Sequence, residues 1–352
     1  MTSDLAKRHL KKMNDISIII VPRERFSAAQ KSLDSILENT PSDCQIIYVD
    51  GNSPRYVRRY IRKKAETRPI THLEYSGYLS PNRARNIGLR EATGEFVIFV
   101  DNDVLVTPNW LESLVKCAQD TGALVVGPLT CIGEPLHRMI HSAGLFFDVR
   151  ADDAGHQLIC QSNPFADRLV TDASNELQRQ SCDYVEFHCV LVRRCVFAQT
   201  GLLDEKLLNT REHIDFCLTV KKAGGTIFCE PASVATYISA PPLRISDMPF
   251  FLLRWSDAWE RSSLEHFRSK WQFTDDDYFE KRFRNMGSMR RILVKDFCAK
   301  YLFHLFGQYK AEQLGARVSR ITAPFERIFS GLLIGAFISS GDRRQQHIKE
   351  VR

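Results

Sequence analysis

The stretch Gly94-Glu-Phe-Val-Ile-Phe-Val-Asp-Asn-Asp103 decides the fold. Its apolar part, Phe96–Val100, predicts a buried strand, which ends in two carboxylates separated by one residue. In an extended backbone, residues i and i+2 point to the same side, so Asp101 and Asp103 can converge on one ion. Carboxylate oxygens suit Mg²⁺ or Mn²⁺, which bind through one or two carboxylates together with substrate phosphates. Two acids that merely end a strand are the alternative, and the triplet alone leaves it open.

Strands and helices alternate on both sides of this stretch. Short apolar runs predict strands at Ile16–Val21, Cys44–Val49 and Ile70–Tyr75. Apolar periodicity predicts helices at Ser27–Glu38, Tyr56–Glu66 and Asn82–Ala92, and another that begins at Pro108 after an N-cap at Thr107. This alternation indicates an α/β fold with a doubly wound, Rossmann-like sheet. Such sheets bind ligands at the carboxyl ends of their strands.

The second half of the chain is less regular. Residues 127–180 are rich in Gly, Pro, Asp and Ser, and we expect loops and small strands there that form an acceptor region. Regular elements resume with a predicted strand at Tyr184–Val192, a helix at Ile214–Ala223 and a last short strand at Thr226–Cys229. From Met248 onward the chain is expected to be mainly helical.

Composition favours an ordinary globular enzyme. The 352 residues are 44% hydrophobic and 26% charged, and the net charge of +6 favours anionic substrates or lipid over nucleic acid. The polar, basic start (1–12) lacks a signal-peptide pattern, so we expect reduced cysteines and a cytoplasmic protein. The apolar run Ile328–Ser340 is too short to span a bilayer. With its basic neighbours, segment 327–344 predicts contact with the inner face of a membrane, although packing on the catalytic domain explains it equally well.

Two further motifs, both before the strand at Phe96–Val100 in the chain, are typical of ligand binding. Tyr48-Val-Asp-Gly-Asn-Ser53 is a second apolar strand that ends in an acid, so carboxylates from two strand ends face one crevice. Pro81-Asn-Arg-Ala-Arg-Asn-Ile-Gly88 begins a helix, where free amides and arginines favour phosphate.

The ordered set of motifs resembles glycosyltransferase family 2, whose enzymes have the GT-A fold. Its acidic turn, its A-R-N-x-G helix and its D-x-D strand are matched by Val49–Ser53, Ala84–Gly88 and Gly94–Asp103. The resemblance implies that Asp50 contacts the base of a nucleotide, usually uracil, and that Asp101 and Asp103 hold a metal ion with the diphosphate. The other expected contacts to the nucleotide-sugar are Pro22, Glu24, Asn52, Arg85, Asn86 and Asn102.

The resemblance also implies a domain organisation. It extends over residues 14–240, with a nucleotide-sugar half at 14–126 and an acceptor half at 127–240. A mainly helical extension at 241–352 follows. Val185–Arg194 resembles the strand of the family that borders the acceptor.

A catalytic base is expected at the head of the later helix. The family has an acidic E-D pair there, and one carboxylate deprotonates the acceptor hydroxyl. Here Glu212 is retained, but the next residue is His213. Glu212 is therefore the first candidate for the base, with Asp215 and His213 as alternatives. Because Asn209 precedes Glu212 by three residues, the pair can also be a helix-capping arrangement.

This sequence departs from the family at two other places. The turn after the first strand is Pro22-Arg-Glu-Arg25 and lacks the usual tyrosine, so Glu24 or Arg25 is expected to contact the nucleotide instead. The late histidine that completes many metal sites is missing from Ser233–Ala240, where Tyr237 is near its place. We therefore expect a metal held by the two aspartates and the diphosphate only. His188, in the acceptor-border strand, either contacts the acceptor or is a satisfied, partly buried histidine.

The sequence thus predicts an inverting, metal-dependent glycosyltransferase. It would use Mn²⁺ or Mg²⁺ to transfer a sugar from a nucleotide-sugar, most simply a UDP-sugar, to a hydroxyl of a glycan or lipid-linked acceptor. A sugar-nucleotide nucleotidyltransferase is disfavoured, because Val21–Ser27 lacks the glycine-rich loop of that class. A catalytically silent nucleotide-binding module on the same fold is the remaining alternative. No nucleic-acid partner is expected.

Overall fold

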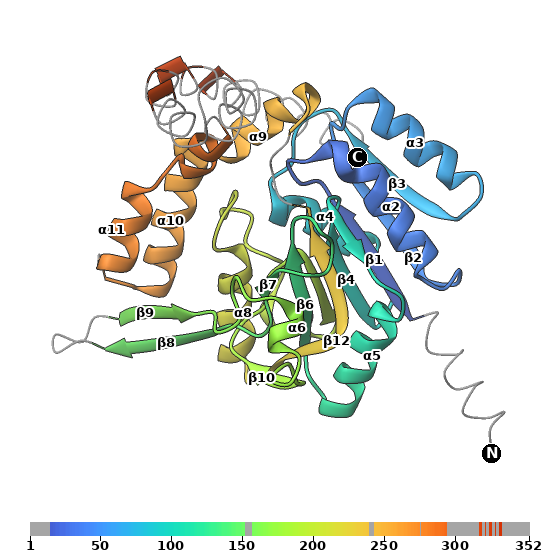
Figure 1. Cartoon of the computed structure of the whole chain (residues 1–352), viewed down its shortest axis with the longest axis horizontal. Coiled ribbons are helices and arrows are strands. Elements are labelled where there is room, and N and C mark those ends of the chain that lie inside the picture. Colours follow the sequence, from blue (N-terminus) through green and yellow to red (C-terminus); the bar gives the residue numbers. More distant parts are fainter. Residues whose placement is uncertain are drawn as a thin grey trace.

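The strand β1 (Ile16–Val21) runs through the middle of a ten-stranded mixed sheet and is buried along its whole length. The computed structural model describes residues 15–151, 157–238, 243–274 and 276–293, and isolated positions between 317 and 332. The other strands of this sheet are β2 (Gln45–Gly51), β3 (Ile70–Tyr75), β4 (Phe96–Asp101), β5 (Val104–Val106), β6 (Val125–Ile132), β7 (Ile140–Ser142), β10 (Gln180–Cys182), β11 (Cys189–Arg193) and β12 (Ile227–Tyr237). Strands β8 (Phe146–Ala151) and β9 (Gln157–Ser162) form a separate hairpin, which projects from the molecule in Figure 1.

Strand directions place several chain segments at one edge of the sheet. The order is β10-β12-β6-β11-β4-β1-β2-β3, with β5 beside β12 and β7 beside β6. β1 to β4 are parallel, β12 is parallel to β6, and β11 lies antiparallel between β4 and β6. The carboxyl ends of β1, β2, β4 and β12 therefore meet the amino end of β11. This edge is where a doubly wound sheet binds its ligands.

Helices cover both faces of the sheet, because β1 carries apolar side chains on both of its faces. Ile19 and Val21 pack into one hydrophobic core and Ile18 and Ile20 into the other, because successive strand residues point to opposite faces. The helices are α2 (Ala29–Glu38), α3 (Arg55–Ala65), α4 (Pro81–Glu91), α5 (Trp110–Thr121), α6 (Val170–Ala173), α7 (Val196–Thr200), α8 (Glu212–Lys222), α9 (Met248–Arg254), α10 (Asp257–Trp271) and α11 (Asp277–Arg284), with short 3₁₀ turns at Phe26–Ala28 and Ile245–Asp247. α4, α7 and α8 contribute to the first core, and α2, α3, α5 and α9 to the second.

Gly88 lets α4 lie directly on β1. A Cβ atom added to this glycine would stand 2.3 Å from Cγ2 of Ile19, so any larger side chain would push the helix away from the sheet. The close approach brings the first turns of α4 beside the carboxyl end of β4, where Arg85 contacts Asp101.

The predicted fold is confirmed, but several element boundaries differ from those predicted. Helix α5 begins at Trp110 rather than Pro108, because the backbone N–H and hydroxyl of Thr107 both bond to the carbonyl of Val234 and the hydroxyl cannot cap the helix. The strand expected at Tyr184–Val192 begins only at Cys189, since Tyr184 pairs with Leu145 on a different segment. The last predicted strand is the start of the much longer β12.

The region after β12 is helical where it is described, as expected. α9 packs in the second core through Phe250 and Leu253, and α10 in the first core through Phe267. The predicted membrane-contact segment 327–344 lies almost wholly outside the described residues. Among the residues that are described, we find no helix long and apolar enough to cross a membrane.

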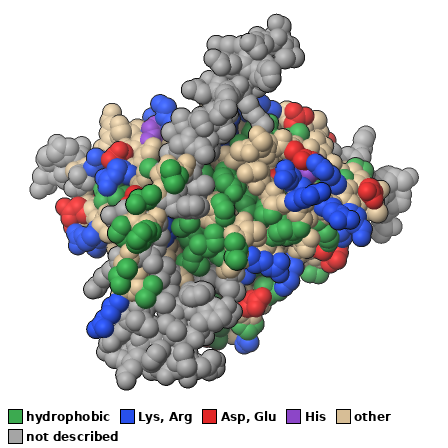
Figure 2. All heavy atoms as spheres, turned by 90° about the horizontal axis from the view of Figure 1, so that it is seen from above, with side chains coloured by type: hydrophobic (Ala, Val, Ile, Leu, Met, Phe, Trp, Pro, Cys, Tyr) green, Lys and Arg blue, Asp and Glu red, His purple; other side chains and the backbone are tan. Residues whose placement is uncertain are grey.

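A basic surface lies on α3. Its exposed side chains line a shallow hollow with Tyr56 and Glu66, and the cations there are Arg55, Arg58, Arg59, Arg62 and Lys63. Figure 2 shows Lys and Arg side chains gathered on the side of the molecule where α3 lies in Figure 1. Five of the chain's 48 lysines and arginines thus lie together on one helix.

Candidate active site

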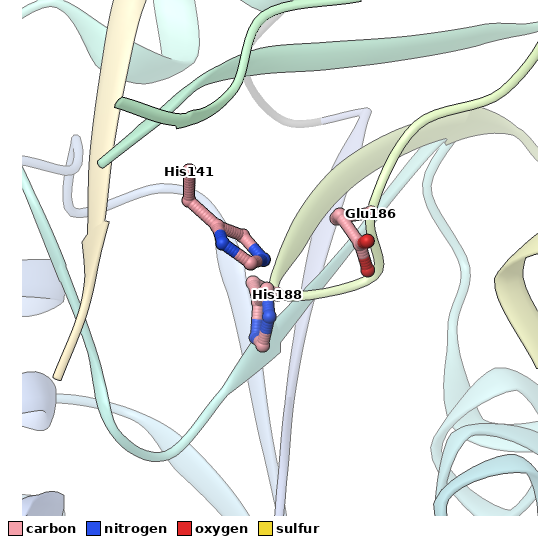
Figure 3. A group of neighbouring side chains, drawn as sticks. All are labelled: His141, Glu186 and His188. Atoms are coloured by element: carbon pink, nitrogen blue, oxygen red, sulfur yellow. The ribbon is translucent and has the colours of Figure 1, made fainter. Parts of the chain in front are cut away.

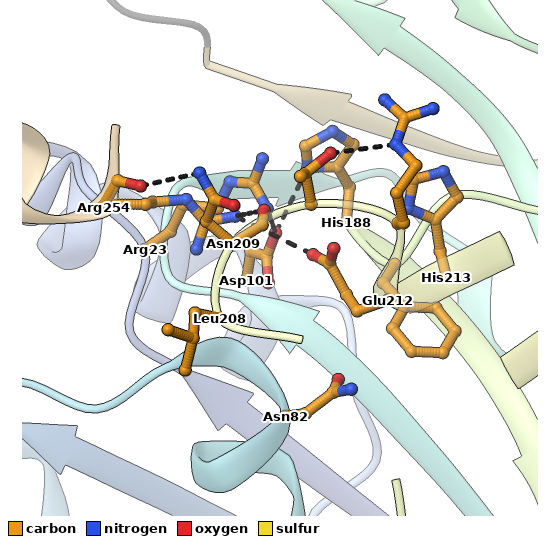
Figure 4. A network of polar contacts seen from close by, with 12 residues as sticks. Arg23, Asn82, Asp101, His188, Leu208, Asn209, Glu212, His213 and Arg254 are labelled. Atoms are coloured by element: carbon orange, nitrogen blue, oxygen red, sulfur yellow. Dashed lines mark hydrogen bonds and ion pairs between the residues drawn. The ribbon is translucent and has the colours of Figure 1, made fainter. Parts of the chain in front are cut away.

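Asp101, the last residue of β4, lies among three nitrogen-bearing side chains (Figure 4). Its Oδ2 is 3.1 Å from Nη1 of Arg23 and 3.2 Å from Nδ1 of His188, and its Oδ1 is 3.2 Å from Nη2 of Arg85. Burial alone would raise the pKa of Asp101, but Arg23, His188 and Arg85 together lower it below its usual range. Asp101 is therefore a stable, buried carboxylate.

Asp103, unlike Asp101, has no hydrogen-bond partner for either oxygen of its carboxylate among the described residues. It is fully buried. Burial raises its pKa well above the usual range, and Arg23 offsets this shift only in part. A buried carboxylate without partners is costly unless something positive binds it. Beside the ionised Asp101, these two oxygens fit a hard divalent cation.

The turn after β1 is fixed by the residue between the two aspartates. The side-chain oxygen of Asn102 accepts a hydrogen bond from the backbone N–H of Arg23 at 2.8 Å, and the N–H of Asn102 donates to the carbonyl of Val21. Pro22 lies within the loop that these bonds close. Of the predicted contacts to the nucleotide-sugar, Pro22 and Asn102 therefore lie together beside Asp101 and Asp103.

Glu24 is held by the C-terminal helices. Its Oε2 lies 3.0 Å from Nε of Arg254 and 3.5 Å from Nε of Arg23, and Nε1 of Trp255 donates to its Oε1 at 3.2 Å. Both Glu24 and Arg254 are buried. Burial opposes ionisation, but Arg254 and Arg23 lower the pKa of Glu24 below its usual value. Arg254 thus joins the turn after β1 to the end of α9.

Asp50 lies at the end of β2, two strands away from β4. Its Oδ1 accepts from the N–H of Ser53 at 2.7 Å, and its Oδ2 is 3.3 Å from Nε2 of His72 on β3. Asn52 adopts a left-handed backbone, φ 62°, which asparagine tolerates better than most residues. The turn that follows β2 is therefore closed by Asp50 itself, and the carboxylate is buried at the same sheet edge as Asp101.

The two helix residues expected near phosphate have different surroundings. Arg85 is fully buried, contacts Asp101 and stacks over the ring of Phe187 at 4.7 Å. Asn86 exchanges hydrogen bonds with the backbone of Leu203 and donates to Glu205. Asn86 thus ties α4 to the turn before α8, and its amide groups are occupied by these bonds.

Glu212, the first residue of α8, points toward the same region from the opposite side (Figure 4). It is buried; Oε1 is 3.9 Å from Nη2 of Arg254, and Oε2 has no hydrogen-bond partner in the described part of the chain. The capping alternative was wrong, because Arg211 occupies the N-cap position and the Asn209 side chain donates to the carbonyl of Arg254.

The other two candidates for the base are engaged elsewhere. Asp215 accepts from Nζ of Lys270 and from Nε1 of Trp271, both at 2.8 Å, so its oxygens anchor α10 to α8. Nε2 of His213 is 3.6 Å from Oε1 of Glu186. Of the three candidates, Glu212 alone has a carboxylate oxygen without a partner among the described residues.

A family model described as Glycosyl transferase family 2 matches residues 17–194, half of the sequence. The chain belongs to glycosyl transferase family 2. The match confirms the predicted fold and class of enzyme. It contains Asp50, Asp101 and Asp103, whereas Glu212 and Arg254 lie beyond it.

Several curated proteins are similar to this family 2 chain over part of their length. The Pre-mycofactocin glycosyltransferase of Mycobacterium tuberculosis is 24% identical over 65% of this chain and 44% of that protein. The GalNAc(5)-diNAcBac-PP-undecaprenol beta-1,3-glucosyltransferase of Campylobacter jejuni is 30% identical over 33% of this chain and 38% of that protein. The chain spans less than half the length of each. A crystal structure of GalNAc-T7 with UDP, GalNAc and Mn²⁺ covers 78% of this chain and 57% of that one, at 16% identity and a TM-score of 0.46.

Three residues of this family 2 site were not found by sequence reasoning. His72 contacts Asp50, and Arg23 and Arg254 surround the acidic groups. Arg23 was visible in the turn after the first strand, where a cation beside the D-x-D strand could have been noticed. No pattern in the sequence around Arg254 indicated its role. It lies 230 residues after Glu24, and the fold alone brings the two side chains together.

Proposed function

We propose that this family 2 chain transfers a sugar from a UDP-sugar to a hydroxyl of a glycan or lipid-linked acceptor, with inversion and with the help of Mn²⁺ or Mg²⁺. One observation supports this proposal above the others. Asp103 carries two buried carboxylate oxygens without partners among the described residues, directly beside the ionised Asp101. A divalent cation with a bound diphosphate would satisfy both carboxylates.

The donor would lie along the edge of the sheet. Asp50, with His72 behind it, would accept a hydrogen bond from the single ring N–H of uracil. The diphosphate would lie toward Asp101 and Asp103, where the metal ion would neutralise charge on the leaving group. Arg23 and Arg85 would add fixed positive charge on the same side.

Glu212 would supply the base. In the proposed reaction the acceptor hydroxyl gives its proton to Oε2 of Glu212 while its oxygen forms a bond to the anomeric carbon. The bond from that carbon to the phosphate oxygen breaks, and UDP leaves with the electron pair. Glu212 would reach the acceptor from the start of α8, an element separate from the end of β4 that carries Asp101.

The class of acceptor is proposed from similarity and charge. The Campylobacter relative is named for an undecaprenol-linked substrate. The exposed cations on α3 would favour approach to an anionic membrane surface that carries such a lipid. Contact of segment 327–344 with the inner face of a membrane belongs to the same proposal.

Release of UDP from a panel of UDP-sugars tests the donor assignment. The native chain, Asp103→Asn and the exposed control Asp43→Asn would be compared with Mn²⁺, with Mg²⁺ and after metal removal. We expect release that needs metal and is lost only in Asp103→Asn. UDP binding without turnover of any donor, with glycan and lipid-linked acceptors present, would favour a silent module. Release of pyrophosphate from a nucleoside triphosphate would favour a nucleotidyltransferase instead.

A further inference from the structure

Three side chains beside the donor site have the composition of a transition-metal site. His141 lies on β7, Glu186 on the loop before β11, and His188 at the residue preceding β11. Each offers one ligand atom, and these atoms all lie within 4.8 Å of one another. Figure 3 shows the two imidazoles and the carboxylate converging from these segments. None of the three has a role in the proposed transfer reaction.

Asp101 determines which nitrogen of His188 is available. Its Oδ2 lies 3.2 Å from Nδ1 of His188, and an ionised carboxylate can only accept a hydrogen bond. A hydrogen bond from Nδ1 to this carboxylate leaves Nε2 as the nitrogen available to a metal ion. Metal-bound histidines commonly donate their other N–H to a carboxylate in this way, which fixes the tautomer and orients the ring.

The ring of His188 is also fixed by packing. It stacks on Tyr237 with centroids 4.1 Å apart and planes 17° apart, and the ring of His141 meets it edge-on at 5.4 Å. His188 is buried, whereas His141 and Glu186 are half-buried, so one side of the group is open to solvent. Oε1 of Glu186 lies 3.6 Å from Nε2 of His213, which is too long for a hydrogen bond, so the carboxylate can turn toward the imidazoles by giving up this weak ion pair.

We propose that His141, Glu186 and His188 bind a transition-metal ion, for which Zn²⁺ is the best match, in addition to the metal proposed at Asp101 and Asp103. Two imidazoles and one carboxylate are a typical zinc ligand set with a fourth position open to water or a substrate oxygen. Ligand atoms of a tetrahedral zinc site lie roughly 3.3 Å apart. Small side-chain rotations of His141 and Glu186 would therefore close the site around the ion.

Direct metal binding tests the proposal without any need for turnover. The full chain, stripped with a chelator, would be titrated with Zn²⁺ in a calorimeter, and the absorption spectrum of bound Co²⁺ would report imidazole ligation. We expect one tight Zn²⁺ per chain, lost in His141→Ala, His188→Ala and Glu186→Gln. The matched control is His137→Asn, which removes a nearby imidazole and keeps a residue that tolerates its left-handed backbone, φ 60°.

Asp103→Asn separates this site from the proposed donor site. The variant should keep the tight Zn²⁺ and the Co²⁺ spectrum even though metal-dependent UDP binding is lost. Circular dichroism would confirm that each variant is folded before it is scored. Tight Zn²⁺ binding that persists in all three ligand variants, or that disappears in Asp103→Asn or His137→Asn, would overturn the proposal. So would the absence of tight binding to the native chain.

Discussion

Nη1 of Arg23 lies 3.1 Å from Oδ2 of Asp101, so a carboxylate proposed to bind metal already has beside it a cation whose side chain is only 12% exposed. The same guanidinium lies 5.4 Å over the ring of Tyr237, which holds it in place. Without donor, Arg23 would therefore compete with a metal ion for Asp101. With donor, it would contact the diphosphate.

Replacement of Arg23 should separate these two effects. Arg23→Gln is expected to strengthen Mn²⁺ binding to the nucleotide-free chain and to weaken UDP binding in the presence of Mn²⁺, each by roughly tenfold, or about 1.4 kcal/mol. Calorimetric titrations with Mn²⁺ and with UDP measure both. Arg55→Gln on the exposed face of α3 is the control and should change neither. Weaker Mn²⁺ binding in Arg23→Gln would contradict this competition.

Asp103→Asn should stabilise the metal-free chain while it removes metal-dependent UDP binding. Burial raises the pKa of Asp103 well above its usual range, so the metal-free native chain must bind a proton there at neutral pH, a cost that the uncharged amide avoids. We expect a thermal midpoint raised by roughly 2–4 °C, measured by differential scanning calorimetry with chelator present. Asp43→Asn should leave the midpoint unchanged. A lower midpoint for Asp103→Asn would mean that the carboxylate is satisfied in the metal-free chain.

Glu212→Gln should slow transfer and spare donor binding. Loss of a general base is expected to lower the rate by about 100-fold or more, because the acceptor hydroxyl keeps its proton. UDP affinity should change less than twofold, and Glu38→Gln, at the exposed end of α2, should behave as the native chain. Initial rates of transfer at saturating donor would be measured for the native chain and for both variants.

Asp215→Asn distinguishes the second candidate for the base. Because Asp215 joins Lys270 and Trp271, its replacement should lower the thermal midpoint and leave the rate of the folded enzyme near native. A rate as low as that of Glu212→Gln in a folded Asp215 variant would transfer the role of base to Asp215.

Glu260 on α10 should make stability depend on pH. Burial raises its pKa from 4.5 to about 7, although the N–H of Gly287 and the charges of Arg290 and Arg291 oppose the shift and Asp257 adds to it. The native state therefore binds a proton more tightly than the unfolded state, and the free energy of unfolding falls as pH rises from about 4.5 through 7.

Glu260→Gln cannot ionise and should remove this dependence. We expect the variant to be more stable than the native chain at pH 8, by on the order of 1–2 kcal/mol, and equally stable near pH 4.5. Urea unfolding at several pH values measures the difference. Glu265→Gln, on an exposed part of the same helix, should show no such trend. A constant difference across the pH range would indicate a packing effect instead.

The parts of the site that are local in sequence could be predicted from it. Asp101 and Asp103 follow a strand whose apolar residues define its burial, and the parallel neighbours that bring Asp50 to the same edge follow from strand–helix alternation. The motif glycine Gly88 also fits, since it lies where α4 touches β1.

Contacts between distant segments could not be predicted in this way. The hydrogen bond from Trp255 to Glu24 spans 231 residues, and that between His188 and Asp101 spans 87. His188 faces Asp101 because β11 runs antiparallel to β4: Cys189 pairs with Val100, and the backbone N–H of Asp101 donates to the carbonyl of His188. Such pairings depend on how separate elements pack, which apolar periodicity does not encode.

The buried pair of Glu24 and Arg254 limits how parts of this chain could be exchanged with those of a relative. A hybrid joined near residue 240 would keep Glu24 but take its counter-charge from a foreign sequence. Unless that sequence supplied an arginine at the end of α9, Glu24 would keep only its longer contact with Arg23, and loss of the buried partner would cost up to about 3–5 kcal/mol. Grafts intended to change acceptor preference should therefore transfer α9 and the turn after β1 together, from the same parent protein.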